Sequence, residues 1–224
     1  MWLMKWIVLG IIVLGSIAGG IWYFFSMSQP LETRERGALT QTHSVYERES
    51  IRQTEILAKP GSGSNINRAN LHMLLSQMLT ADLTDDERKT LAEQARGQAE
   101  KLRTDIDRTK GVHTSVVRAI ESIQDVSIAS RAYSKKQESL ISLMMQKQVT
   151  AESITTTLYA INDQTEGIIT RILDEEGALT PEHIQYINEE TSDAETRHDQ
   201  LTQLYHEYES LGDEVESMYT SLMQ

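Results

Sequence analysis

The chain of 224 residues contains no cysteine, so no disulfide can hold its fold together. It also lacks any Asn-x-Ser/Thr motif, the acceptor for N-linked glycosylation. Secreted eukaryotic domains commonly carry one or both features. Their joint absence favours a bacterial or archaeal envelope protein.

Residues that interrupt helices are scarce. The three prolines stand at positions 30, 60 and 181, and few glycines occur where apolar residues recur at helical spacing. No stretch alternates polar and apolar residues for long enough to indicate a sheet. The sequence therefore predicts an all-α protein.

Catalytic motifs are absent as well. The sequence has no P-loop, no Gly-x-Gly-x-x-Gly, no nucleophile elbow and no calcium loop. No two of its six histidines are spaced three or four residues apart, as metal ligands on one helix would be. Glu195-Thr-Arg-His198 matches one Glu-x-x-His motif of a di-iron bundle, but a second is missing. His198 falls on an apolar stripe, so we expect it to be a hydrogen-bonded core histidine. Because the catalytic and metal-binding motifs are missing, we expect no enzyme activity, no cofactor and no metal.

One long apolar run is present, from Trp6 to Phe25, and it carries no charge. Twenty helical residues cover about 30 Å, the thickness of the hydrocarbon core, so the run predicts a transmembrane helix. A cleaved signal peptide with a site at Ser16-Ile-Ala18 is the alternative. The run continues past that site into aromatic residues suited to a bilayer interface. The expected interface anchors are Trp6, Trp22, Tyr23, Phe24 and Phe25.

The run divides the chain into three parts: a tail at 1–5, the anchor at 6–25 and a helical body at 26–224. Lys5 and the terminal amine favour a cytoplasmic N-terminus, which leaves the body periplasmic or extracellular. This arrangement is that of a single-pass protein of the inner (cytoplasmic) membrane. Gly15 and Gly19 form a small-xxx-small pattern, which permits close contact between spans and hence a homo-oligomer.

Within the body, the pattern predicts an antiparallel bundle of four to five long helices. Its clearest loop is expected at 59–66, and further breaks are expected near 80–84, 111–113, 148–150 and 177–180. Thr84 and Glu87 form a capping box, and Thr150 is a candidate cap for a later helix. The helix count stays open, because a continuous helix could cross Gly111.

The last helix is expected to begin at Thr180-Pro181 and to run for about 60 Å. A heptad pattern is sustained along it. One position holds Ile184, Thr191, His198, Tyr205, Gly212 and Tyr219, and its partner holds Ile187, Ala194, Leu201, Tyr208, Val215 and Leu222. A flanking stripe adds Leu204, Leu211 and Met218, and we expect these stripes to face the core, with Tyr205, Tyr208 and Tyr219 buried.

Charge is distributed unevenly. Residues 26–173 carry 19 acidic and 19 basic side chains, whereas residues 174–224 carry 14 acidic residues and a single base, Arg197. This acidity is either a solvated outer face or a docking surface for a basic partner. It repels phosphates, so nucleic acid is not expected as a ligand. The candidate partner-binding face comprises Glu189, Glu190, Asp193, Glu207 and Glu209.

The segments 66–75, 83–91 and 101–107 resemble the first hairpin of the four-helix-bundle sensory domains of bacterial chemoreceptors. That resemblance implies a periplasmic bundle that binds a ligand. The sequence lacks the second span and the cytoplasmic signalling region of those receptors. A sensory role would therefore need a separate signalling partner.

Together these patterns predict a membrane-anchored scaffold, accessory or assembly subunit of an envelope complex. Its expected partners are the lipid bilayer and other envelope proteins with a basic surface. A ligand-sensing bundle and a passive coiled-coil spacer are the alternatives.

Overall fold

A computed structural model describes residues 31–57, 63–78, 83–174 and 180–224. Within these ranges the chain forms helices and no strand. The helices are α2 (Thr33–Leu57), α3 (Gly63–Met78), α4 (Asp85–Gln124), α5 (Arg131–Asp174) and α6 (Pro181–Met223). The all-α prediction is confirmed for these ranges.

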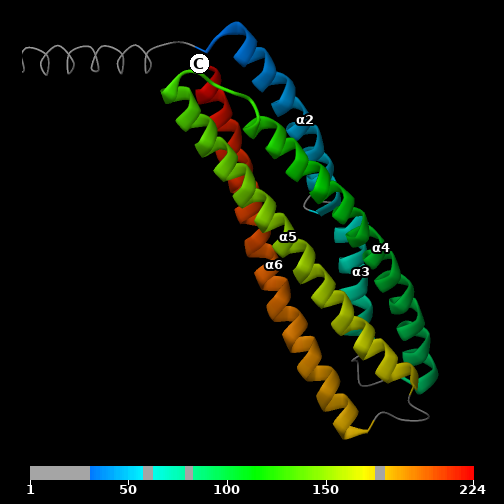
Figure 1. The fold of residues 1–224 in the computed structure, drawn as a ribbon. Coiled ribbons are helices and arrows are strands. Elements are labelled where there is room, and N and C mark those ends of the chain that lie inside the picture. The colour runs from blue at the N-terminus through cyan, green and yellow to red at the C-terminus, as the bar shows by residue number, and fades with distance from the viewer. Residues whose placement is uncertain (1–30, 58–62, 79–82, 175–179) are drawn as a thin grey trace, which may run out of the picture.

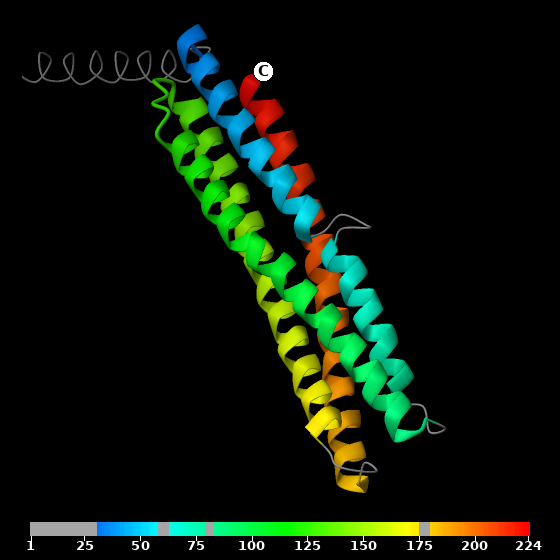
Figure 2. The same cartoon turned by 90° about the vertical axis from the view of Figure 1, so that its right-hand side faces the viewer.

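The helices form a bundle of four antiparallel columns (Figures 1 and 2). Three columns are the long helices α4, α5 and α6, each about 60 Å in length. The fourth is made of two pieces, since α2 and α3 follow one another along the bundle and both pack against α4. The start of α2, the α4–α5 turn and the end of α6 lie at the same end of the bundle (Figure 1).

Helix starts agree with the sequence signals. Thr84 caps α4 through a capping box: its hydroxyl accepts from the Glu87 amide at 3.3 Å, and the Glu87 carboxylate accepts from the Thr84 amide at 2.9 Å. Thr180 caps α6, with Pro181 at the first helical position. Both predicted caps are confirmed.

Two predicted breaks are wrong. α4 continues through 111–113, and α5 continues through 148–150. Gly111 is exposed on α4. A glycine in a helix costs about 1 kcal/mol relative to alanine, and the burial of Val112 and Val116 beside it offsets that cost. Thr150 is buried in the interior of α5 and donates to Glu207 at 3.3 Å instead of capping a helix.

The turn between α4 and α5 lies at residues 125–130, where no break was predicted. Side chains of α5 and α2 form hydrogen bonds with the backbone at this turn. The Gln137 amide donates to the carbonyls of Ile123 at 2.6 Å and Val126 at 2.8 Å, which closes the end of α4. Glu35 of α2 accepts from the Ala129 amide at 2.7 Å.

The core consists of two apolar clusters, one in each half of the bundle. The larger cluster lies among α3 and the adjoining halves of α4, α5 and α6, and includes Leu102 and Leu201. The smaller one lies beside α2 and includes Leu39 and Met144. Of the two heptad positions of α6, the one containing Leu201 is the buried stripe, while Ile184 on the other is 46% exposed.

The predicted anchor at 6–25, with Gly15 and Gly19, lies outside the described residues. No helix in the ranges that the structure describes is both long enough and apolar enough to cross a bilayer. α3 begins at Gly63, inside the loop expected at 59–66.

Candidate functional site

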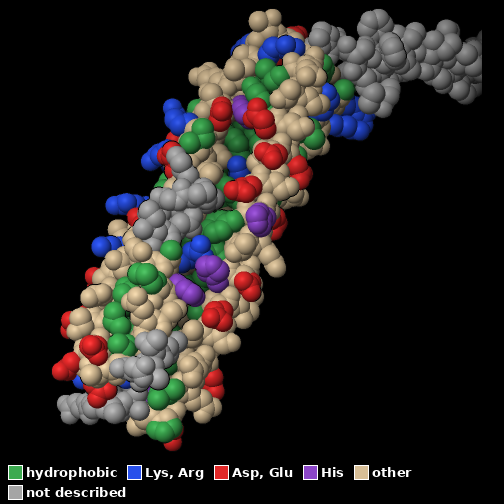
Figure 3. All heavy atoms as spheres, turned by 180° about the vertical axis from the view of Figure 1, so that it is seen from behind, with side chains coloured by type: hydrophobic (Ala, Val, Ile, Leu, Met, Phe, Trp, Pro, Cys, Tyr) green, Lys and Arg blue, Asp and Glu red, His purple; other side chains and the backbone are tan. Residues whose placement is uncertain are grey.

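The predicted acidic face belongs to α6, and acidic side chains gather along one edge of the bundle (Figure 3). Glu189, Asp193, Glu207 and Glu209 are exposed. Glu190 is half-buried and accepts from the Gln164 amide of α5 at 3.3 Å. Glu207 is also bonded to α5, through the Thr150 hydroxyl, so the structure separates Glu190 and Glu207 from the other three members of the face.

The acids of α6 lack cationic partners. Residues 181–223 hold eleven acidic side chains against Arg197, and in the described part of the chain none of these carboxylates lies within 4 Å of a lysine or arginine nitrogen. Several acids are instead one helical turn apart, as Glu189 and Asp193 are. Such like-charge pairs destabilise a helix by about 0.2–0.5 kcal/mol each. The face keeps its charge at a cost in stability.

A buried polar layer crosses the middle of the bundle. Its centre is His113 of α4, whose Nδ1 lies 2.8 Å from the Gln53 amide nitrogen of α2 and 3.0 Å from that of Gln148 in α5. Its Nε2 lies 2.9 Å from the Thr155 hydroxyl. Tyr208 of α6 joins the layer by donating to the Gln53 side-chain oxygen at 3.0 Å.

These bonds determine the protonation state of the His113 ring. Two amide groups point their donors at Nδ1, so Nδ1 accepts and Nε2 carries the proton that goes to Thr155. Burial lowers the pKa of His113, and the nearby Glu152 and Gln148 oppose that shift. The layer therefore needs a neutral imidazole.

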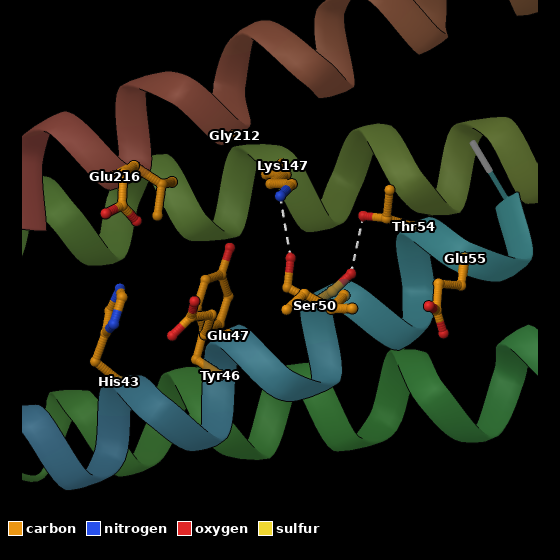
Figure 4. Close-up of a pocket in the computed structure, with 11 residues that line it drawn as sticks. His43, Tyr46, Glu47, Ser50, Thr54, Glu55, Lys147, Gly212 and Glu216 are labelled. Carbon is orange, nitrogen blue, oxygen red and sulfur yellow. Dashed lines mark hydrogen bonds between the residues drawn. The ribbon is translucent and has the colours of Figure 1, made fainter. Parts of the chain in front are cut away.

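A groove of about 440 Å³ opens between α2 and α6, with α5 at its base (Figure 4). It is lined by His43, Tyr46, Glu47, Ser50, Ile51, Thr54, Glu55, Lys147, Gly212, Val215 and Glu216. None of these residues was singled out as a site by the sequence. A lysine and a histidine beside three glutamates make this lining polar and charged as well as concave.

Lys147 stands at the base of the groove. Its ammonium donates to the Ser50 hydroxyl at 3.0 Å and lies 4.6 Å from the centre of the Tyr208 ring. Burial lowers the pKa of Lys147, and Asp213 opposes that shift. A Cβ added at Gly212 would lie 3.3 Å from Nζ, so the glycine provides the space that this side chain occupies.

His43 lies at one end of the groove, near Glu216 (Figure 4). Its ring stacks on Tyr219, with the centroids 3.5 Å apart, and the residue is only 6% exposed. The buried Nε2 has no hydrogen-bond partner. Burial lowers the pKa of His43, while Glu216 and Glu47 act in the opposite direction.

The histidine of the Glu-x-x-His motif is hydrogen-bonded to an arginine of a neighbouring helix. His198 is half-buried, and its Nδ1 lies 2.7 Å from the Arg68 guanidinium of α3. No cluster of metal-ligating side chains occurs among the residues that the structure places.

The groove was missed because its residues come from three helices far apart in sequence. One signal was present: Gly212 occupies a heptad position of the last helix, where a larger residue would be expected in a well-packed stripe. Comparison with protein-family models, with curated proteins and with solved structures finds no match for this chain.

Proposed function

We propose that this protein is a membrane-anchored helical bundle that binds a basic partner protein through the outer face of α6. It acts as a scaffold, accessory or assembly subunit of an envelope complex. The observation that carries the proposal is the unpaired charge of α6, eleven acids against one base.

The cost of that charge supports a role in binding. A helix that needed only solubility could mix both signs, as α4 does with eight acidic and eight basic residues. Complementary charge speeds association and excludes wrong partners. A basic partner would also relieve the repulsion between neighbouring acids on α6.

Charge reversal tests the partner face. Glu189, Asp193, Glu207 and Glu209 are replaced together by lysine, and proteins that co-purify in mild detergent are compared with those of the wild type. The matched control reverses four of the exposed acids of α4, Asp86, Glu93, Glu100 and Glu121. The proposal expects partners to be lost in the α6 variant alone, and an unchanged set of partners would contradict it.

The anchor is proposed from the apolar run Trp6–Phe25. A permanent tether keeps the chain in the membrane fraction after carbonate extraction. Release by carbonate, or mature protein that starts near residue 19, would instead indicate a cleaved signal peptide.

Ligand sensing is the second candidate, and the α2–α6 groove favours it. The groove is of a size that admits a small molecule, and its lining includes a lysine, a histidine and three glutamates. Ligand binding raises the unfolding midpoint by mass action, so a thermal-shift screen of small metabolites tests this role.

A further inference from the structure

The α2–α6 groove carries opposite charges at its two ends. The Lys147 ammonium marks one end, and the carboxylates of Glu47 and Glu216 mark the other (Figure 4). Both ends belong to the same groove, so a single ligand with two opposite charges could contact both.

The Lys147 end calls for an anion. An ammonium has three N–H donors, and the Ser50 hydroxyl accepts only one of them. No carboxylate lies within 4 Å of Nζ among the described residues, even though the chain carries a net charge of −12. A carboxylate from outside would accept the remaining donors in a partly buried setting, where charge-assisted bonds are strong.

The His43 end calls for a cation. The carboxylates of Glu47 and Glu216 lie close enough to the His43 ring to oppose the lowering of its pKa by burial, and both side chains are exposed. Glu47 is one turn from His43 on α2, whereas Glu216 reaches the same end from α6 (Figure 4). An ammonium there would be attracted by both carboxylates.

Helical geometry sets the distance between the two ends. Ser50, which marks the anion end, is three residues from Glu47 and seven from His43, or roughly 4.5 to 10 Å along the helix. Gly212 marks the same end on α6 and is four residues, about 6 Å, from Glu216. An extended dipeptide with free termini spans about 7 Å, whereas a single amino acid spans about half as much.

We propose that the groove binds a small zwitterion of about dipeptide length, whose carboxylate meets Lys147 and whose ammonium meets Glu47 and Glu216. Tyr46 and Val215 add apolar surface to the lining of the groove. This inference is separate from the proposed partner face and names a ligand class for the ligand-sensing candidate.

Isothermal titration calorimetry of the full chain in mild detergent tests the pairing, with glycylglycine as the probe. Three analogues each remove one feature: N-acetylglycylglycine lacks the ammonium, glycylglycinamide lacks the carboxylate, and glycine lacks the length. We expect each to bind at least about tenfold more weakly than glycylglycine. Equal binding of all four, or no binding of glycylglycine at about 10 mM, would overturn the proposal.

Substitution at the groove assigns the ends. Glu216→Gln should weaken glycylglycine about tenfold, because one charge-assisted contact is lost, and should leave N-acetylglycylglycine unchanged. Glu214→Gln is the matched control, since Glu214 is exposed on the same helix and does not line the groove. A loss of affinity in Glu214→Gln equal to that in Glu216→Gln would contradict the assignment.

Lys147→Gln removes the ammonium that would bind the carboxylate of the ligand. Glycylglycine and glycylglycinamide should then bind this variant with equal affinity. Because Lys147 is half-buried, the thermal unfolding of the Lys147→Gln variant is measured as well. If that variant unfolds, Glu216→Gln, a change at an exposed residue, still tests the proposal. The charge reversals of the outer face should leave glycylglycine binding in place. Loss of a protein partner and loss of the zwitterion can thus be told apart.

Discussion

Helices α4 and α6 have nearly the same length, yet they differ in what they bury and in how they carry charge. α4 has twelve buried residues, and α6 has six. α4 pairs charges along its own surface, as Arg108 with Asp105 and Lys110 with Asp107, whereas no such pair forms on α6 within the described residues. α4 therefore buries much more of its surface in the fold than α6 does.

Position in the bundle explains the contrast. α4 packs against three helices, α2, α3 and α5, so most of its circumference is covered. α6 packs closely on α5, while its seam with α2 opens into the groove. Polar and aromatic side chains meet across that seam, as in the stack of His43 on Tyr219.

Truncation of buried side chains should show the largest effect. Leu102→Ala on α4 removes a fully buried side chain from the larger core cluster and should cost about 3 kcal/mol of unfolding free energy. Ile184→Ala on α6 removes an exposed one and should cost about 0.5 kcal/mol or less. Urea unfolding followed by circular dichroism measures both. Similar costs would contradict the division of roles.

The polar layer should make stability depend on pH. His113 has a lowered pKa in the fold, so below about pH 6.5 the unfolded chain binds more protons and the unfolding free energy falls toward the folded pKa. His113→Leu should cost about 2 kcal/mol at pH 7.5, because the amides of Gln53 and Gln148 lose their acceptor. It should also flatten the fall in stability between pH 7 and pH 5.

Urea titrations at several pH values follow this change, with His206→Gln as control because His206 is an exposed residue of α6. The remaining slope belongs in part to His43, whose pKa is also lowered by burial. An undiminished slope in His113→Leu would show that the layer does not require a neutral ring.

The helix caps give a smaller contrast. Thr84→Ala breaks a reciprocal capping box at the start of α4 and should cost about 1.5 kcal/mol. Thr180→Ala removes one bond at the start of α6, where Pro181 already favours the first turn, and should cost about 0.5–1 kcal/mol. Thermal melts of the two variants rank them, and the reverse order would count against the capping box.

A single charge change on α6 should have the smallest effect, and it should be stabilising. Glu209→Lys turns the repulsion between residues 209 and 213 into a favourable Lys–Asp pair, a gain of about 0.5 kcal/mol. Added salt should reduce the gain. A destabilised variant would mean that the acidic face contributes to folding, which the cost of its charge argues against.

Much of the helical layout could be predicted because its signals are local. The Thr84–Glu87 box, the Thr180-Pro181 start and the stripe through Leu201 and Tyr208 all depend on residues within one or two turns. The predicted helix breaks that proved wrong are those where a local signal was weak or was outweighed by burial of neighbouring side chains. Gly111 and Thr150 resemble break points, but buried neighbours hold both within continuous helices.

The sequence by itself determined that the described chain is helical, that capping residues mark the starts of α4 and α6, and that α6 is acidic. These features could be predicted because backbone propensity, capping and charge are properties of short segments. Only the tertiary structure decided the turn at 125–130, where Gln137 and Glu35 bond the freed backbone from other helices. It likewise brought Lys147, His43 and Glu216 into one groove. Both depend on contacts between residues far apart in the chain, which no local pattern encodes.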